Sequence, residues 1–264
     1  MMTKLTGETI TGTVVVLENV YSPQLENARD ITVYLPPSYS EGEKRYPVIY
    51  MHDAQNLFDE SMSFSGEWQV DEAMEMLAQH GVEAIVVGIP NRGGERLAEC
   101  CPFPCDDTEL RGDKYTAFIV ETLKPAIDMN FRTLPDRAST GIMGSSMGGL
   151  ITLYAFFRYP EVFGFAGALS PSCWFADRAI YSFIEQSSFT EGRKLYVDTG
   201  TLEGDEELQD ARRLRDLLMA EGLEVGRDLL YVEGEGAAHT ESAWAYRLHI
   251  ALRFLLPQNI AAMS

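Results

Sequence analysis

The sequence is poor in positive charge. Its 264 residues include 21 Lys and Arg against 40 Asp and Glu, which gives a formal net charge of -19 at pH 7. Binding to nucleic acid or to an anionic membrane surface needs clustered Lys and Arg, so this balance argues against both kinds of partner. A charge of this size keeps a protein soluble but does not indicate a particular chemistry.

The sequence also lacks a long apolar run. Nowhere do 18 uncharged apolar residues follow one another, and residues 1–13 hold one lysine and no apolar stretch of the kind found in signal peptides. We therefore expect a cytoplasmic protein with no membrane partner. Because no polar linker and no internal repeat divides the chain, residues 1–264 are predicted to form a single domain.

Cysteine is scarce as well. Cys100, Cys101 and Cys105 crowd one stretch and Cys173 stands alone, with no CxxC pair and no histidine nearby. This spacing does not suit zinc, and we expect neither a metal nor another cofactor. Structural thiols are the first interpretation, and a regulatory disulfide is the alternative.

What is present is a regular alternation of strands and helices. Two segments rich in Val, Ile and Thr predict an antiparallel pair near the N-terminus, and continuous apolar strands then alternate with helices. This order predicts a doubly wound α/β architecture, with a mostly parallel sheet, helices on both faces and an antiparallel N-terminal edge. The predicted strands are 12–20, 30–35, 46–51, 84–89, 139–143, 164–169, 194–198 and 228–233, and the predicted helices are 68–80, 114–129, 147–159, 206–221 and 240–256.

Two longer insertions, 91–112 and 171–192, follow predicted strands at their carboxyl ends. Ligands bind at this edge of such sheets, so we expect the insertions to wall a pocket. In the second insertion we select Trp174 as a substrate-pocket residue. Ordinary core packing is the alternative for Trp174 and for the other aromatic candidates, which are Phe58, Phe64, Trp68 and Phe175. Arg92 and Arg96 are interpreted as solvated, with binding of an anionic group as the alternative.

The strongest chemical signal is a GxSxG motif at residues 144–148, between an apolar strand and a helix. A serine in this context stands on a tight turn that exposes its hydroxyl, as in the α/β-hydrolase fold. We predict Ser146 as the nucleophile and the amide of Met147, at the helix N-terminus, as one oxyanion donor. The second donor is expected in the loop after strand 46–51, at the amide of Gln55. A helix-capping serine with packing glycines is the alternative.

A histidine should act as the base of such a site. His239 lies in a small-residue loop between the last predicted strand and the last predicted helix, from which a general base reaches the serine. His52 is the less favoured candidate, with a role in shaping the oxyanion loop instead. His80 and His249 are interpreted as structural.

The acid of the site is expected after strand 194–198, where Asp198, Glu203 and Asp205 compete. It must stay ionised and accept a hydrogen bond from the histidine, which requires a loop position beyond the end of the strand. This condition favours Glu203 or Asp205 over Asp198. Glu203 is our first choice.

Together these residues resemble the esterase family of α/β-hydrolases that includes esterase D-type, feruloyl, acetylxylan and enterochelin esterases. The resemblance covers nearly the whole chain and rests on residues 50–58, 144–149, 169–172, 200–203 and 239–241. It implies Ser146 as nucleophile and His239 as base. Glu203 stands where many members have an aspartate, and Ala54 replaces a more usual glycine. Some members work with a serine–histidine dyad, so the third residue stays open.

The sequence therefore predicts a serine carboxylic-ester hydrolase that acts through an acyl-enzyme on a small or carbohydrate-linked ester. Acyl transfer or thioester cleavage on the same triad is one alternative, and a catalytically silent binding module is another. A metal-dependent hydrolase is disfavoured because His52, Asp53 and Asp59 form no recognised ligand spacing. The sequence leaves the natural ester and the oligomeric state open.

Overall fold

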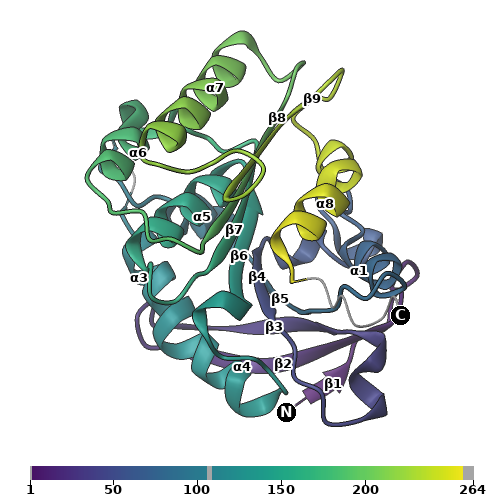
Figure 1. Cartoon of the computed structure of the whole chain (residues 1–264). Helices are drawn as coiled ribbons and strands as arrows, with labels where there is room; N and C mark the ends of the chain where they lie inside the picture. The colour runs from purple at the N-terminus through teal and green to yellow at the C-terminus, as the bar shows by residue number, and fades with distance from the viewer. Residues whose placement is uncertain (1, 106–108, 258–264) are drawn as a thin grey trace.

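The computed structural model describes residues 2–105 and 109–257, and within them the strands form one sheet in the order β1-β2-β3-β5-β4-β6-β7-β8-β9 (Figure 1). Strands β4 to β9 pair in parallel, while β1, β2 and β3 form an antiparallel edge that joins β5. The predicted sheet is confirmed. The strands are β1 (Met2–Lys4), β2 (Thr13–Ser22), β3 (Asn27–Leu35), β4 (Val48–His52), β5 (Ile85–Ile89), β6 (Thr140–Ser145), β7 (Phe165–Leu169), β8 (Lys194–Gly200) and β9 (Leu229–Gly234).

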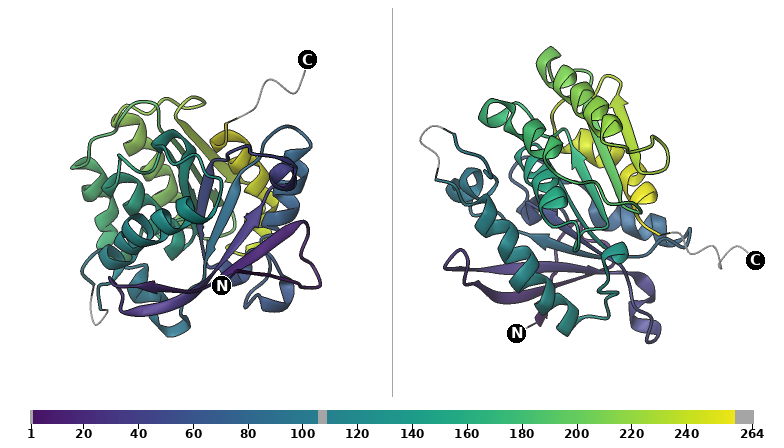
Figure 2. Two further views of the ribbon diagram at one scale, coloured as in Figure 1. Left: turned by 90° about the horizontal axis from the view of Figure 1, so that it is seen from below. Right: turned by 60° about the vertical axis from the view of Figure 1, so that its left-hand side comes forward.

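Helices cover both faces of the sheet, each over its own buried apolar core. On one face lie α1 and α8, and on the other lie α3 to α7 (Figures 1 and 2). The helices are α1 (Val70–Ala78), α2 (Arg96–Glu99), α3 (Gly112–Ala117), a π-helical segment η5 (Phe118–Leu123), α4 (Lys124–Asn130), α5 (Met147–Arg158), α6 (Phe175–Glu185), α7 (Asp205–Ala220) and α8 (Glu241–Leu255). Short 3₁₀ turns include η2 (Ala54–Asn56), η3 (Glu60–Met62) and η4 (Gly93–Glu95).

The central strands are buried on both faces, which explains their continuous apolar sequences. Every residue of β4, β5, β6 and β7 is buried. A strand of a parallel sheet with helices on both sides has no solvent face and needs no polar alternation. The parallel strands end at one common edge, and the loops that follow β4, β6, β7, β8 and β9 meet there.

Some predicted elements differ from the structure. The helix predicted from residue 68 begins at Val70, because Gln69 has a left-handed backbone with φ of 55°. The insertion at 171–192 contains α6, which was not predicted, and residues 176–178 at its start have positive φ. Its buried residues are Phe175, Ile180, Tyr181 and Ile184, so the sequence did carry a helical apolar spacing. Residues 106–108 of the first insertion lie outside the described residues.

All four cysteines are free thiols in this structure. The Sγ atoms of Cys101 and Cys105 lie 3.5 Å apart. Burial is the largest influence on Cys100 and raises its pKa, which keeps the thiol protonated and unreactive. In the part of the chain that is described, no helix has the length and apolar character needed to cross a bilayer.

Candidate active site

Ser146 occupies the tight turn between β6 and α5. Its φ of 56° and ψ of -123° are strained values for a residue with a side chain, and they are characteristic of an exposed nucleophile on this kind of turn. A Cβ atom at Gly144 would lie 2.7 Å from Cδ2 of His52 and 3.0 Å from the backbone of Gly148, so the turn requires glycine there. The amide of Ser146 donates to the carbonyl of Leu169 at 3.0 Å and fixes the turn against β7.

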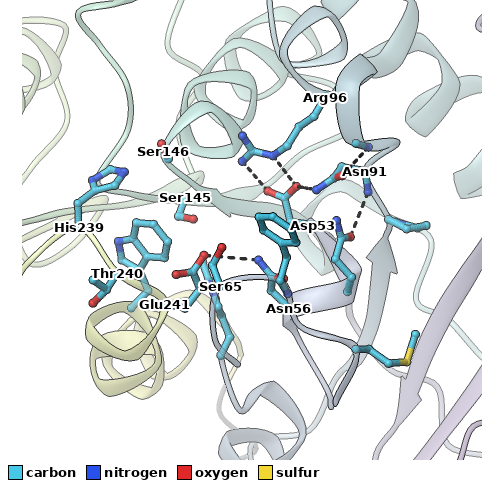
Figure 3. Close-up of a pocket in the computed structure, with 17 residues that line it drawn as sticks. Asp53, Asn56, Ser65, Asn91, Arg96, Ser145, Ser146, His239, Thr240 and Glu241 are labelled. Atoms are coloured by element: carbon cyan, nitrogen blue, oxygen red, sulfur yellow. Dashed lines mark hydrogen bonds and ion pairs between the residues drawn. The ribbon is translucent and has the colours of Figure 1, made fainter. Parts of the chain in front are cut away.

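Ser146 and His239 line the same pocket, which has a volume of about 1050 Å³ and lies at the carboxyl ends of the parallel strands (Figure 3). The Oγ of Ser146 lies 3.3 Å from the Oγ of Ser172. Within the described residues no hydrogen bond joins Ser146 to His239. Such contacts are often long in a free enzyme and shorten when substrate binds.

His239 has a carboxylate behind it. Its Nδ1 lies 2.8 Å from Oε2 of Glu203, whose side chain is 1% exposed while that of His239 is 39% exposed. The other carboxylate oxygen of Glu203 accepts hydrogen bonds from the hydroxyl of Ser170 and from the amide of Gly200, each at 2.6 Å. Burial raises the pKa of Glu203, but these three hydrogen bonds outweigh it and leave the pKa below its usual value. Glu203 therefore stays ionised.

The loops after β8 and β9 bring Glu203 and His239 together. The amide of Leu202 donates to the carbonyl of Ala237 at 2.9 Å, so the two loops are joined through their backbones. A Cβ atom at Gly200 would collide with that same carbonyl, so this approach requires a glycine.

Trp244 supports the histidine and was missed by the sequence analysis. Its ring packs edge-on against His239, with ring centroids 4.9 Å apart. Its Nε1 donates to the hydroxyl of Ser170 at 2.9 Å, which ties it to the hydrogen bonds of Glu203. The available signal was its place in the first turns of α8, directly after the His239 loop.

The two competing carboxylates have other surroundings. Asp198 is fully buried and pairs with Arg247, with Nε 2.8 Å from Oδ2. Asp205 is exposed in the first turn of α7, where a negative charge favours the helix N-terminus. In the structure, Glu203 is the one of the three candidates whose carboxylate contacts His239.

The opposite wall of the pocket is built around Asp53. Arg96 donates to both of its carboxylate oxygens, at 2.7 and 2.8 Å, and Nδ2 of Asn91 donates at 2.6 Å. Burial raises the pKa of Asp53, but the bonds from Arg96 and Asn91 outweigh it and lower the pKa. Arg96 is thus neutralised within the protein, and Arg92 does not line the pocket.

Gln55 lies beside this cluster, in η2. Its Oε1 accepts from the amide of Asn91 at 3.2 Å, which holds η2 against the loop after β5. Gln55 lines the pocket that contains Ser146. Among the described residues, neither the amide of Gln55 nor that of Met147 has a hydrogen-bond acceptor in the protein. Both amides are thus available to a ligand.

His52 lies behind the serine turn and does not line the pocket. It is 3% exposed, and its Nδ1 lies 2.7 Å from the hydroxyl of Tyr115. Burial lowers the pKa of His52 to about 4, so the ring is neutral near pH 7. These surroundings agree with a role in shaping the turn, since the ring packs against Gly144.

The aromatic candidates divide between the pocket and the core. Phe64 and Trp68 line the main pocket, whereas Phe58 and Phe175 are buried elsewhere. Trp174 is 48% exposed and does not line the main pocket. It lines a neighbouring cavity of about 10 Å³ together with Glu203 and His239, so its role in substrate binding stays a prediction.

One group of carboxylates could hold a metal ion among the described residues. Oxygen atoms of Glu67, Asp71 and Glu72 lie within 4.8 Å of one another near the start of α1. None of the three lines the pocket of Ser146, so no metal role in the chemistry of that pocket follows from them.

Comparison with known proteins places this chain in a family. The model of a family described as "Putative esterase" matches residues 22–255. Bacillus subtilis YbbA, whose function is uncharacterized, is 28% identical over 246 residues, which cover 88% of this chain and 94% of YbbA. An endo-1,4-beta-xylanase/feruloyl esterase from Xylanibacter ruminicola is 28% identical over 147 residues, or 52% of this chain and 19% of that protein.

Solved structures share the fold at lower identity. The BES protein from Bacillus cereus has a TM-score of 0.75 and 23% identity, covering 95% of this chain and 97% of its own. The enterobactin esterase FES from Shigella flexneri has a TM-score of 0.73 and 17% identity, covering 94% of this chain and 60% of its own. The architecture is that of the α/β-hydrolase fold. Because the family match extends over residues 22–255, the chain belongs to this esterase family.

Proposed function

We propose that this esterase is a serine hydrolase that cleaves carboxylic esters through an acyl-enzyme on Ser146. The observation that carries the proposal is the strained backbone of Ser146, on a strand-to-helix turn, in one pocket with a histidine that is hydrogen-bonded to a buried carboxylate. A serine held in this way is exposed to substrate, and the histidine supplies the base that it needs.

The reaction proceeds in two halves. His239 Nε2 takes the proton from the Oγ of Ser146 as that oxygen attacks the ester carbonyl carbon, and the protonated imidazole then gives the proton to the leaving alcohol. In the second half His239 deprotonates a water molecule, which attacks the acyl carbonyl carbon. The bond to the Oγ of Ser146 then breaks, the imidazolium returns its proton to that oxygen, and the acid is released. Glu203 keeps Nδ1 of His239 protonated and stabilises the imidazolium in each half.

The oxyanion that forms in each half needs hydrogen-bond donors. We assign this role to the amides of Met147 and Gln55. Met147 begins α5, where the helix dipole and the unpaired N–H groups favour negative charge. Gln55 lines the pocket, and its turn is held in place through Asn91 and Asp53. A rigid donor costs no reorganisation during the reaction.

The test is hydrolysis of p-nitrophenyl esters, from acetate to octanoate and with a feruloyl ester added. We expect hydrolysis by the wild type and a loss of roughly 10³-fold or more in kcat for Ser146→Ala, the scale for removing a triad nucleophile. The dependence on chain length then measures the size of the pocket.

Ser145 provides a matched control, since it also lines the pocket and is the neighbouring residue. Ser145→Ala makes the same chemical change one position earlier and should retain activity to within about tenfold, because its hydroxyl takes no part in bond formation. An inactive wild type, or a Ser146→Ala variant as active as the wild type, contradicts the proposal.

A further inference from the structure

The pocket of Ser146 has an uncompensated negative charge. Its ionisable residues are Asp53, Arg96, His239 and Glu241. The charges of Asp53 and Arg96 cancel, because Arg96 donates to both carboxylate oxygens. His239 must be neutral to act as a base. The charge of Glu241 is therefore left without a partner inside the pocket.

Glu241 has weak contacts within the described residues. No Lys or Arg among these residues forms an ion pair with Glu241. Its Oε1 accepts one long hydrogen bond, of 3.5 Å, from Nδ2 of Asn56. A carboxylate ordinarily accepts shorter and more numerous hydrogen bonds when it is partly buried. Its position is fixed, because it is the first residue of α8 and directly follows Thr240, whose side chain caps the helix. The capacity of Glu241 to bind a positive group is therefore unused.

Aromatic rings lie around the same space. Trp68 and Trp244 line the pocket with ring centroids 5.7 Å apart, and Phe64 lines it while 93% exposed. A Phe ring at the rim of a pocket can contact a bound ligand. Asn56 links the two sides, since its Oδ1 accepts from the amide of Phe64 at 3.3 Å and its Nδ2 faces Glu241.

Carboxylates and aromatic faces both attract organic cations. Aromatic rings bind ammonium groups through their negative faces, and quaternary ammonium ligands are bound in this way. The formal net charge of -19 also raises the concentration of cations at the protein surface and lowers the concentration of anions there. The local and the overall charge thus favour the same kind of ligand.

We propose that the pocket selects esters that carry a positive ammonium group, which Glu241 and the ring of Phe64 bind beside the Ser146 hydroxyl. This inference rests on the proposed function and adds the class of substrate to it. The chemistry is unchanged, since water cleaves the ester into an acid and an alcohol. The ammonium group takes no part in bond formation and is released on one of the two products.

The test compares two esters of the same shape. Acetylcholine and 3,3-dimethylbutyl acetate share the acetyl group. Acetylcholine has a positively charged nitrogen where the other ester has a neutral carbon. We expect the wild type to favour acetylcholine by about tenfold or more in kcat/KM, a ratio in the range of a cation–π contact combined with a charge. Glu241→Gln should remove most of this preference, and Phe64→Leu should reduce it in part.

Glu43→Gln is the matched control, since it removes the same charge from an exposed residue outside the pocket. It should keep the wild-type ratio, which separates local recognition from the general effect of net charge. A wild type that cleaves both esters equally, or a Glu241→Gln variant that keeps the preference, overturns the proposal.

Choline gives a readout that needs no turnover of a choline ester. Half-maximal inhibition of p-nitrophenyl acetate hydrolysis should need about tenfold less choline than 3,3-dimethylbutan-1-ol, and Glu241→Gln should remove most of this difference. Equal inhibition by both alcohols overturns the inference while the esterase proposal stands. If no p-nitrophenyl ester is cleaved, the proposed function fails, and quenching of tryptophan fluorescence by choline still tests the binding site.

Discussion

Two regions of this chain hold carboxylates whose pKa values are shifted in opposite directions. Glu203 accepts three hydrogen bonds, and its pKa lies below the usual value although burial alone would raise it. Asp71, near the start of α1, is fully buried, and burial raises its pKa to about 8. The pKa of the neighbouring Glu67 is raised to about 7, first by burial and then by the charge of Glu72.

The pKa values differ because the two carboxylates accept different hydrogen bonds, not because they are buried to different depths. Asp71 accepts one backbone hydrogen bond, from Thr11 at 2.6 Å, and its other oxygen has no partner among the described residues. Glu203 has a donor on each oxygen, and one of those donors is His239. Hydrogen bonds to the charged form stabilise that form, whereas burial beside like charges does the opposite. An acid that must stay ionised during catalysis therefore needs donors built around it.

The largest effect is expected from removing the charge of Glu203. Glu203→Gln keeps the shape of the side chain but no longer stabilises the imidazolium, and kcat/KM for p-nitrophenyl acetate should fall by roughly 10³- to 10⁴-fold. Asp205 is the other acid that the sequence favoured, and kcat/KM of Asp205→Asn should stay within about twofold of the wild-type value. If Glu203→Gln retains a tenth or more of the activity, the site works as a serine–histidine dyad.

The second prediction concerns Asp71. Its folded-state pKa is raised above the unfolded value, so the folded protein holds this proton more tightly than the unfolded chain. The resulting stability is present below about pH 4 and is lost as pH rises through about 8. Asp71→Asn removes this dependence.

Urea unfolding at pH 5.5 and pH 8.5 measures it. Between these values the wild type should lose about 2 kcal/mol more of its free energy of unfolding than Asp71→Asn does, after allowance for charge coupling and screening. The exposed Glu43→Gln variant serves as the control and should follow the wild type. Identical pH slopes for wild type and Asp71→Asn would show that burial does not raise this pKa.

A smaller effect is expected at Ser170, whose hydroxyl donates to Glu203 at 2.6 Å and accepts from Nε1 of Trp244. Ser170→Ala removes one of the three donors and should lower kcat/KM by about tenfold, the scale of one hydrogen bond to a charged group. The loss should grow as the pH is lowered, because the pKa of Glu203 moves up towards its usual value. A pH–rate profile unchanged from the wild type contradicts this role.

The sequence predicted most of the fold because the central strands are buried on both faces. The apolar runs of β4 and β5 can be assigned without knowledge of their neighbours, and the crossover rule then orders the sheet. Helix α6 was missed although its buried residues keep a helical apolar spacing, and its left-handed start at residues 176–178 has no sequence signal that we recognise. The π-helical segment η5 inside the predicted helix 114–129 has no sequence signal that we recognise.

The candidate site was predictable where chemistry depends on local turns. Ser146 follows from its strand-turn-helix context, and His239 from its place between the last strand and the last helix. The choice between Glu203 and Asp205 depends on how two loops meet across Gly200 and Ala237, which no local pattern encodes. Trp244 and the Asp53–Arg96 pair are long-range contacts of the same kind.

The central claim is that Ser146 carries the acyl group, and labelling tests it most directly. The protein is treated with diethyl p-nitrophenyl phosphate, which leaves a diethylphosphoryl group on an activated serine. The mass of the intact protein counts the added groups, and peptide mapping locates them. We predict one added group, located on Ser146, absent from Ser146→Ala and matched by loss of esterase activity. Labelling of Ser145 or another residue, or full activity in the labelled protein, would contradict the account.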